Sequence, residues 1–249
     1  MPTNLESVYG VAYTPNTKQD VERFVPEDGA IRDDLKFIGK KIDRIRLYSV
    51  TGAPARAAMF AQDIGLSVDL GVWIGADHQS NRGEIDALGR LLRDGYIAGR
   101  VTVGNEAILR AEQSVETLLA YIAGIRTATD IPVGAAEPWH IWMDHPSLAK
   151  GVDFIGVQLL PYWEGIPVAD AAAYAMTRLR ALQAAYPGKP IVVTEIGWPS
   201  QGERIGGAIA SRINQNRFLR EATTLLASSG TPYFVIEAFD RPWKIKTEG

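Results

Sequence analysis

The sequence contains no cysteine, and this absence excludes several kinds of chemistry. Without thiols the chain can form no disulfide, no thiolate nucleophile and no zinc site built on Cys. A chain without Cys can function in either redox environment, so the absence leaves the compartment open.

Long apolar runs and a strong charge of one sign are also missing. No run of about 18 apolar residues occurs, so no segment is predicted to span a membrane. The opening MPTNLESVYG lacks the basic and apolar parts of a signal peptide. With 26 Lys and Arg against 29 Asp and Glu, the net charge is −3, which predicts no nucleic-acid partner.

What is present is the composition of a globular protein with a sizeable core. Of the 249 residues, 46% are hydrophobic and 22% are charged. Short β-rich runs alternate with segments whose apolar residues recur every three or four positions. Strands are expected at 7–15, 42–50, 66–75, 99–106, 131–139, 152–163, 190–198 and 233–243. Helices are expected at 27–40, 53–65, 81–96, 114–130, 145–151, 168–186 and 214–230.

This alternation predicts an α/β fold made of parallel βαβ units. Eight units in a chain of this length indicate a (β/α)₈ TIM barrel, with residues 1–249 as one catalytic domain. A doubly wound open sheet is the alternative. However, the sequence YTPNTK after the first strand is not the Gly-rich fingerprint of that fold. The chain ends soon after the eighth expected strand, so we expect the last barrel helix to be missing from it.

Aromatic and polar residues gather where the expected strands end, which is where TIM barrels place their active sites. All six tryptophans fall at or just after these ends. Indole faces pack on the C–H faces of sugars, while sugar hydroxyls require carboxylates, amides and Arg, so the pattern predicts carbohydrate binding. The expected substrate-binding residues are Tyr13, Arg46, Tyr48, Asn105, Glu137, Trp139, Trp142, Gln158, Tyr162, Trp163, Trp198, Glu237 and Trp243.

Two glutamates stand out as catalytic candidates. Glu106 ends VTVGNE and Glu195 lies in VVTEIGW, each after an otherwise apolar strand. A lone carboxylate there is costly to bury unless it is paired or used. Retaining glycoside hydrolysis needs two carboxyl groups about 5–5.5 Å apart, and strands 4 and 7 face each other across a barrel mouth. Asn105 can hydrogen-bond the sugar 2-hydroxyl. The competing interpretation is that one of these glutamates only forms a structural salt bridge with Arg46.

Other reactive arrangements are weak. The three histidines, at 78, 140 and 145, form no metal-ligand pattern, and no Lys lies inside an expected strand to form a Schiff base. The Gly-rich SQGERIGGAIAS after the seventh strand has no flanking Lys and is expected to be a loop near the cleft rather than a phosphate site. We therefore expect no cofactor and no metal.

Several motifs together resemble glycoside hydrolase family 17, the β-1,3-glucanases and β-1,3-glucan transglycosylases. These are VTVGNE and VVTEIGWPSQG followed by NQNRFLRE, with GVAYTP, IRLYSVTG, LLPYWEG and IEAFDRPWK in the same order. The resemblance implies that Glu106 is the acid/base and Glu195 the nucleophile, and it adds Lys244 to the substrate-binding set. The chain departs from the family pattern at Arg241, where the family usually has an acid, and at Gln158, where bacterial members more often have His.

The resemblance also implies a partner and a setting. LLPYWEG and IEAFDRPWK look most like bacterial members attached to membrane glucan-synthesis proteins. We therefore expect a monomeric transglycosylase acting on β-1,3-glucan oligosaccharides or polysaccharide, located outside the cytoplasm, in the periplasm, as a domain of a larger membrane protein. The alternatives are a hydrolase of the same glucan and a non-catalytic glucan-binding barrel. A phosphate-binding barrel enzyme would need a Lys or an anion site that the sequence does not show.

Overall fold

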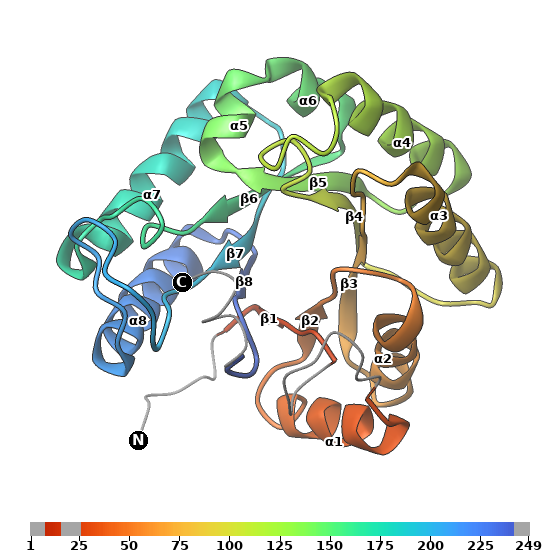
Figure 1. The fold of residues 1–249 in the computed structure, drawn as a ribbon, viewed down its shortest axis with the longest axis horizontal. Helices are drawn as coiled ribbons and strands as arrows, with labels where there is room; N and C mark the ends of the chain where they lie inside the picture. The colour runs from red at the N-terminus through yellow and green to blue at the C-terminus, as the bar shows by residue number, and fades with distance from the viewer. Residues whose placement is uncertain (1–7, 16–25, 242–249) are drawn as a thin grey trace.

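The computed structural model describes residues 8–15 and 26–241, and its strands close into a barrel (Figure 1). All eight strands are parallel to their neighbours and follow one another around the barrel in chain order. This confirms the predicted (β/α)₈ architecture and rules out the open sheet. The strands are β1 Gly10–Ala12, β2 Arg44–Arg46, β3 Ser67–Val72, β4 Arg100–Asn105, β5 Val133–Pro138, β6 Phe154–Leu159, β7 Ile191–Ile196 and β8 Tyr233–Val235.

The helices form a ring around the barrel (Figure 1). They are α1 Asp28–Ile38, α2 Gly52–Asp63, α3 His78–Arg93, α4 Val115–Ala128, α5 Trp139–Asp144, α6 Pro146–Gly151, α7 Val168–Ala185 and α8 Arg212–Ser229. Helix α5 was not predicted, because we expected a strand to run through Trp139. Its 6 residues are too few to show a helical period in the sequence.

Local signals fix several helix ends. The Ser114 side chain accepts a hydrogen bond from the Thr117 backbone N–H at 3.1 Å and so caps α4. Ser211 does the same for α8 through the N–H of Asn214, also at 3.1 Å. Helix α8 stops at Gly230, whose φ of 67° is left-handed and suits glycine.

The hydrophobic core has two separate parts. The larger lies between the outer face of the strands and the helices, and includes Ile155 and Val157 of β6. The smaller fills the barrel interior with Phe154, Val192 and Phe234. A Cβ at Gly134 would lie only 2.7 Å from the Phe154 ring, so glycine makes room for that ring. The barrel is therefore a packed core and not a pore.

Charged residues occupy the end of the barrel where the strands begin. Asp69 of β3 is 3% exposed, and its carboxylate pairs with Arg100 at 3.0 Å and with Arg44 at 3.5 Å. Burial raises the pKa of Asp69, while Arg100, Arg44 and Arg46 oppose that shift. Asp69 pairs in register with Arg46, and its salt bridges run to Arg44 and Arg100 where β2 and β4 begin.

The strand pairing becomes irregular where the strands end. The register shifts between Thr102 and Asn105 on β4, and between the Val157–Val193 and Gln158–Glu195 pairs of β6 and β7. An extra residue at such a bulge breaks the inward–outward alternation of side chains. On β7 the Thr194 Cγ2 atom lies 2.9 Å from the position of a Cβ at the interior Gly156, yet the next residue, Glu195, also points inward. The bulge therefore brings Glu195 into the mouth.

Two further observations concern membrane-spanning helices and the residues that the structure describes. Among the described residues, no helix is long and apolar enough to cross a membrane. The predicted binding residues Trp243 and Lys244 lie outside the described residues, as does everything after residue 241.

Candidate active site

A buried ion pair forms the base of the mouth. Glu195 at the end of β7 is 4% exposed, and its Oε1 lies 2.9 Å from Nη1 of Arg46, which is 1% exposed. The salt bridge that we set against a catalytic role for Glu195 is therefore present. The two are compatible, because a nucleophilic carboxylate must be ionised and the guanidinium supplies its counter-charge. Arg46 is largely enclosed by protein groups and supports the residues around it, while its contact with substrate stays a prediction.

The same arginine holds Asn105. Arg46 Nη2 donates to Asn105 Oδ1 at 2.8 Å, and Gln158 Nε2 donates to the same oxygen at 3.1 Å. With Oδ1 accepting both bonds, the Nδ2 group of Asn105 is left to donate elsewhere. Gln158 is 2% exposed, and its Oε1 has no hydrogen-bond partner among the described residues. Side chains from β2, β4, β6 and β7 thus meet in one polar network.

Tyr48 lies against this network. The Arg46 guanidinium sits 4.4 Å from the centre of its ring. Burial raises the pKa of the Tyr48 phenol well above its ordinary value, and the nearby Glu195 carboxylate raises it further. The phenol is therefore protonated, and it lies near enough to the Glu195 carboxylate for that group to act on its proton, although its geometry there is not that of a well-formed hydrogen bond. It remains a predicted donor for substrate.

Glu237 and Arg241 form a second ion pair beside the mouth. Arg241 Nε lies 2.7 Å from Glu237 Oε2, and its Nη2 donates to the Thr14 carbonyl. The residue that departs from the family pattern therefore pairs with a predicted binding residue. Whether Glu237 contacts substrate stays a prediction.

Glu106 adopts a backbone conformation that is uncommon for glutamate. Its φ is 56°, in the left-handed region. Its N–H donates to the Ala136 carbonyl at 2.8 Å, and its carbonyl accepts from the N–H of Arg110 at 2.9 Å. Its side chain is 26% exposed, and Arg110 Nη1 lies 3.6 Å from its Oε2. The carboxyl group is thus reachable from solvent, with a cation at its side.

Arg110 was not predicted, although one signal was available. It follows Glu106 by four residues, which is the spacing of a helical ion pair. It also pairs with Glu112 at 2.8 Å, and its guanidinium lies 4.8 Å from the centre of the Trp73 ring. One arginine therefore joins the acid of β4 to an exposed indole at the end of β3.

Glu137 was expected to bind substrate, and this prediction is wrong. It pairs in register with the outward-facing Val157, and its side chain is fully buried. Its Oε1 accepts the Ile108 N–H at 2.8 Å and its Oε2 the Leu109 N–H at 3.3 Å. Burial raises the pKa of Glu137 to about 7, and the nearby charge of Glu106 adds to this shift. The two N–H groups and the charge of Arg110 oppose the shift.

Four predicted aromatic residues belong to the core and not to a sugar-binding surface. Trp142 is 0% exposed and donates to the Gly156 carbonyl at 2.9 Å. Trp198 is 2% exposed and donates to the Ile209 carbonyl at 3.0 Å. Since a sugar needs an open ring face, both predictions are wrong.

The two tyrosines are enclosed in the same way. Tyr162 packs on Trp198 with ring centres 5.4 Å apart and donates to the Glu203 carbonyl. The Tyr13 hydroxyl donates to Asp34 of α1 at 2.9 Å, and the ring has no exposed surface. Both assignments to substrate are therefore wrong.

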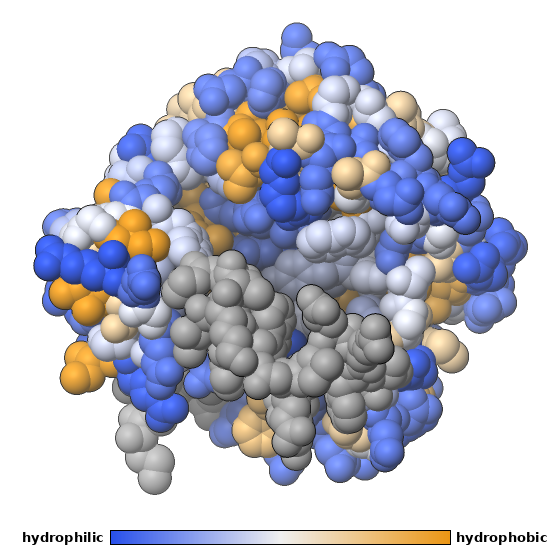
Figure 2. All heavy atoms as spheres, in the orientation of Figure 1, coloured by the Kyte–Doolittle hydropathy of each residue, from blue (hydrophilic) through white to orange (hydrophobic). Residues whose placement is uncertain are grey.

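Three tryptophans remain accessible at the strand ends. Trp73 is 39% exposed and Trp163 is 46% exposed. Trp139 is half-buried; its Nε1 donates to Glu164 at 3.1–3.2 Å, and Arg178 lies 4.2 Å from its ring centre. Figure 2 shows hydrophilic residues around a recess at the centre of the ring of helices. Exposed indoles at the strand ends, together with a hydrophilic recess, are features that a carbohydrate site requires.

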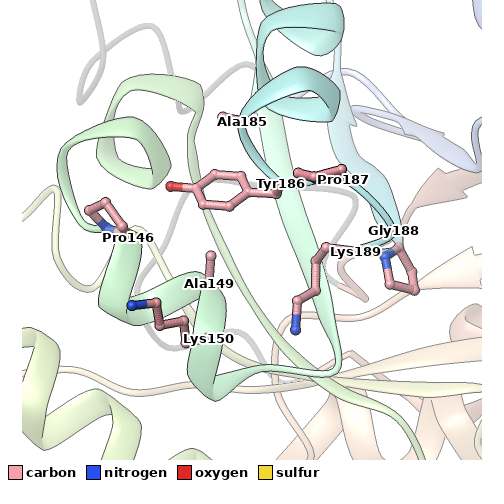
Figure 3. Close-up of a pocket in the computed structure, with 9 residues that line it drawn as sticks. Pro146, Ala149, Lys150, Ala185, Tyr186, Pro187, Gly188 and Lys189 are labelled. Carbon is pink, nitrogen blue, oxygen red and sulfur yellow. The ribbon is translucent and has the colours of Figure 1, made fainter.

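A separate cavity of about 680 Å³ lies away from this recess (Figure 3). It is bounded by α6, the end of α7 and the loop that enters β7, at the opposite end of β7 from Glu195. Lys189 at its edge donates to the Val152 carbonyl at 2.8 Å, and Tyr186 donates to the Trp142 carbonyl. None of the predicted site residues lines this cavity.

Within residues 8–15 and 26–241, no group of three or more His, Asp or Glu is placed to hold a metal.

The pKa of Glu137 predicts a pH-dependent stability. Folding raises it from an ordinary value of 4.5 to about 7, so the folded chain binds this proton more tightly than the unfolded chain. The free energy of unfolding is therefore expected to fall by about 3 kcal/mol as the pH rises through this interval. In Glu137→Gln this part of the fall should disappear. Urea titrations at pH 4.5 and pH 8 measure it, and equal pH dependence in both proteins would contradict the expectation.

Comparisons with known proteins agree on one family. The BtgE/BtgC glycoside hydrolase domain family matches residues 10–249. A probable glucan endo-1,3-beta-glucosidase btgC of Aspergillus fumigatus is 27% identical over 275 residues, covering 97% of this chain and 40% of the relative. The glucan endo-1,3-beta-glucosidase btgC of Emericella nidulans is 25% identical, covering 95% of this chain and 41% of the relative. The chain thus spans about 40% of these relatives' length. They are fungal proteins, so the bacterial part of the expected resemblance has no support here.

Solved structures share the fold. A glycoside hydrolase family 17 β-1,3-glucanosyltransferase from Rhizomucor miehei has a TM-score of 0.87 at 24% identity, covering 97% of this chain and 90% of that one. An active-site mutant of the same enzyme, in complex with laminaritriose, matches equally well. An endo-laminarinase from Formosa Hel1_33_131 has a TM-score of 0.82 at 18% identity, covering 97% and 80%.

Proposed function

Because the chain belongs to the BtgE/BtgC glycoside hydrolase domain family, we propose that it is a retaining enzyme that acts on β-1,3-glucan. The observation that carries the proposal is the buried Glu195–Arg46 pair, in which Arg46 also binds Asn105, the residue preceding Glu106. The strand ends thus bring a carboxylate paired with a cation, at β7, and a more exposed carboxyl group, after β4, to one mouth. We propose residues 1–249 as a single catalytic barrel domain.

The proposed substrate follows from the relatives and from the site. The btgC relatives are named for endo-1,3-β-glucosidase activity, and the Rhizomucor miehei structure contains laminaritriose. In this chain Trp73 and Trp163 offer exposed indole faces beyond the ends of β3 and β6. Gln158 Oε1, which is buried without a partner in the described residues, is placed to accept a sugar hydroxyl. A buried acceptor left unpaired costs about 1–3 kcal/mol, so substrate that satisfies it binds more tightly.

The reaction uses the two glutamates in two steps. A Glu195 oxygen attacks the anomeric carbon, and the bond from that carbon to the leaving sugar oxygen breaks. Glu106 gives its proton to this oxygen as it leaves. In the second step Glu106 takes a proton from the acceptor hydroxyl, whose oxygen attacks the anomeric carbon and releases Glu195. The Asn105 amide donates to the 2-hydroxyl, a contact that strengthens in the transition state.

The acceptor decides between two activities. We propose transfer, in which a hydroxyl of another β-1,3-glucan chain is the acceptor. Hydrolysis, with water as acceptor, is the second candidate, and the names of the btgC relatives favour it.

Product analysis separates the two activities. Incubation with a laminari-oligosaccharide of one length, followed by mass spectrometry, is expected to give products longer than the input. Carrying out the reaction in ¹⁸O-labelled water gives the control, because only hydrolysis places the label in new reducing ends. Products that are all shorter, with the label in every newly formed reducing end, would replace transfer with hydrolysis.

A further inference from the structure

We propose that Glu137 is a positioning residue for Glu106, and that it acts by holding the loop after β4 through the backbone N–H groups of Ile108 and Leu109. The proposal rests on the proposed function, in which Glu106 is the acid/base. It gives Glu137 a role that contact with substrate cannot explain, because this side chain has no exposed surface.

The first argument is the geometry of the loop. The residues after Glu106 form turns and no regular helix until α4 begins at Val115. Glu106 itself sits at φ 56°, a conformation that costs glutamate about 1–3 kcal/mol and persists only where its surroundings impose it. Strand β5 imposes it from both sides. The Ala136 carbonyl binds the Glu106 N–H at 2.8 Å, and the Glu137 carboxyl binds the N–H groups of Ile108 and Leu109.

The second argument is that a carboxylate is an expensive choice for this position. A buried anion costs several kcal/mol unless it is compensated, and the compensation here is two backbone N–H groups rather than a direct cation partner. An amide of the same shape has only one oxygen and would turn an NH₂ group toward one of those N–H donors. Ionised glutamate, the form above its pKa of about 7 here, is the side chain of this length whose two oxygens can both accept, so it can hold two successive N–H groups.

Charge couples the two carboxyl groups as well. The charged groups that act on Glu137 are Glu106 and Arg110, both in the loop after β4. An ionised Glu137 disfavours a second negative charge on Glu106, and so favours the protonated form that the first step needs. Arg110, 3.6 Å from Glu106, acts in the opposite sense.

The test compares substrates that differ in their need for acid catalysis. In Glu137→Gln, kcat/KM for a laminari-oligosaccharide is expected to fall roughly 100-fold, as for an acid displaced by about 1 Å. For a 2,4-dinitrophenyl laminaribioside, whose leaving group needs no proton, the fall should be under about 3-fold, since acid catalysis contributes little there. The alkaline limb of the oligosaccharide pH profile should also move to lower pH. A variant that merely folds poorly would lose both activities together.

Should Glu137→Gln not fold, Glu137→Asp is used, which keeps the charge and shortens the side chain by one methylene.

Glu84→Gln is the matched control. Glu84 is 7% exposed and also binds two backbone N–H groups at the mouth, those of Val50 at 3.1 Å and Trp73 at 3.3 Å. It makes no bond to the loop that holds Glu106, and through Trp73, a proposed binding residue, it acts on both substrates alike, so the ratio of the two activities in Glu84→Gln should stay at the wild-type value. An unchanged ratio in the Glu137 variant, or an equal change in Glu84→Gln, would overturn the proposal. Glu106→Gln tests the underlying function separately, because full oligosaccharide activity in that variant would overturn the acid/base assignment itself.

Discussion

Glu195→Gln is expected to lower turnover of laminari-oligosaccharides by roughly 10⁴-fold or more, the scale of loss when a nucleophile is removed. The amide cannot attack the anomeric carbon, so no glycosyl-enzyme forms. Gln is preferred to Ala because its oxygen can still accept the hydrogen bond from Arg46, which donates at 2.9 Å in the structure. Oligosaccharide binding should therefore remain measurable by calorimetry, while rates are followed by product analysis.

Asp69→Asn is the control for the loss of a buried carboxylate. Asp69 is 3% exposed and paired with Arg100, as Glu195 is with Arg46, but its salt bridges are to Arg100 and Arg44, at the beginnings of β4 and β2, and not to the residues that hold Glu195 or Glu106. Its replacement should lower the melting temperature and leave the rate per folded molecule near the wild-type value. Wild-type turnover in Glu195→Gln would overturn the mechanism, whereas oligosaccharide binding without turnover by the wild-type protein would favour a non-catalytic glucan-binding barrel.

Arg46→Met is expected to have the largest effect on stability. The guanidinium binds Glu195 and Asn105 and packs on the Tyr48 ring. Removing one partner of a buried pair leaves the other charge uncompensated, which costs about 3–5 kcal/mol. Activity should be lost as well, because Asn105 and the proposed nucleophile are released together. Denaturant unfolding and turnover measured on the same preparations test both expectations.

The double variant Arg46→Met with Glu195→Gln sharpens this test. With both charges removed, no uncompensated ion is left, so much of the lost stability should return while activity stays absent. Arg46→Lys should fall between these cases, since one ammonium replaces two separate guanidinium contacts. If Arg46→Met unfolded at the wild-type denaturant concentration, the buried pair would not contribute as described.

The fold could be predicted because its signal repeats. Each of the eight strands adds an apolar run and each of the seven connections between them an expected helix, so errors at single boundaries do not change the architecture. Helix α5 was missed because its 6 residues carry too little of that pattern. The closed barrel then follows from the number of units and their parallel order.

The site was less predictable, because the sequence gives the end of a strand but not the direction of a side chain. Trp142 and Trp198 lie at the expected positions along the chain and point into the core. Glu137 has the composition signal of a site residue, yet it lies in register with Val157 on the outer face of its strand. Glu106 and Glu195 could be selected from the sequence because each is a lone carboxylate that follows an otherwise apolar strand.

The bulge on β7 has a consequence for how the strand responds to change. Val193 pairs with Val157 of β6, but the next residue of β6, Gln158, pairs with Glu195 and not with Thr194. The pairing of β7 with β6 is thus shifted by one residue after Val193. An insertion or deletion between Ile191 and Thr194 would slide Glu195 relative to Arg46, however conservative the residue added or lost. Variation in this strand is therefore expected to be confined to substitution. The position of the bulge thus fixes which residue of β7 faces Arg46.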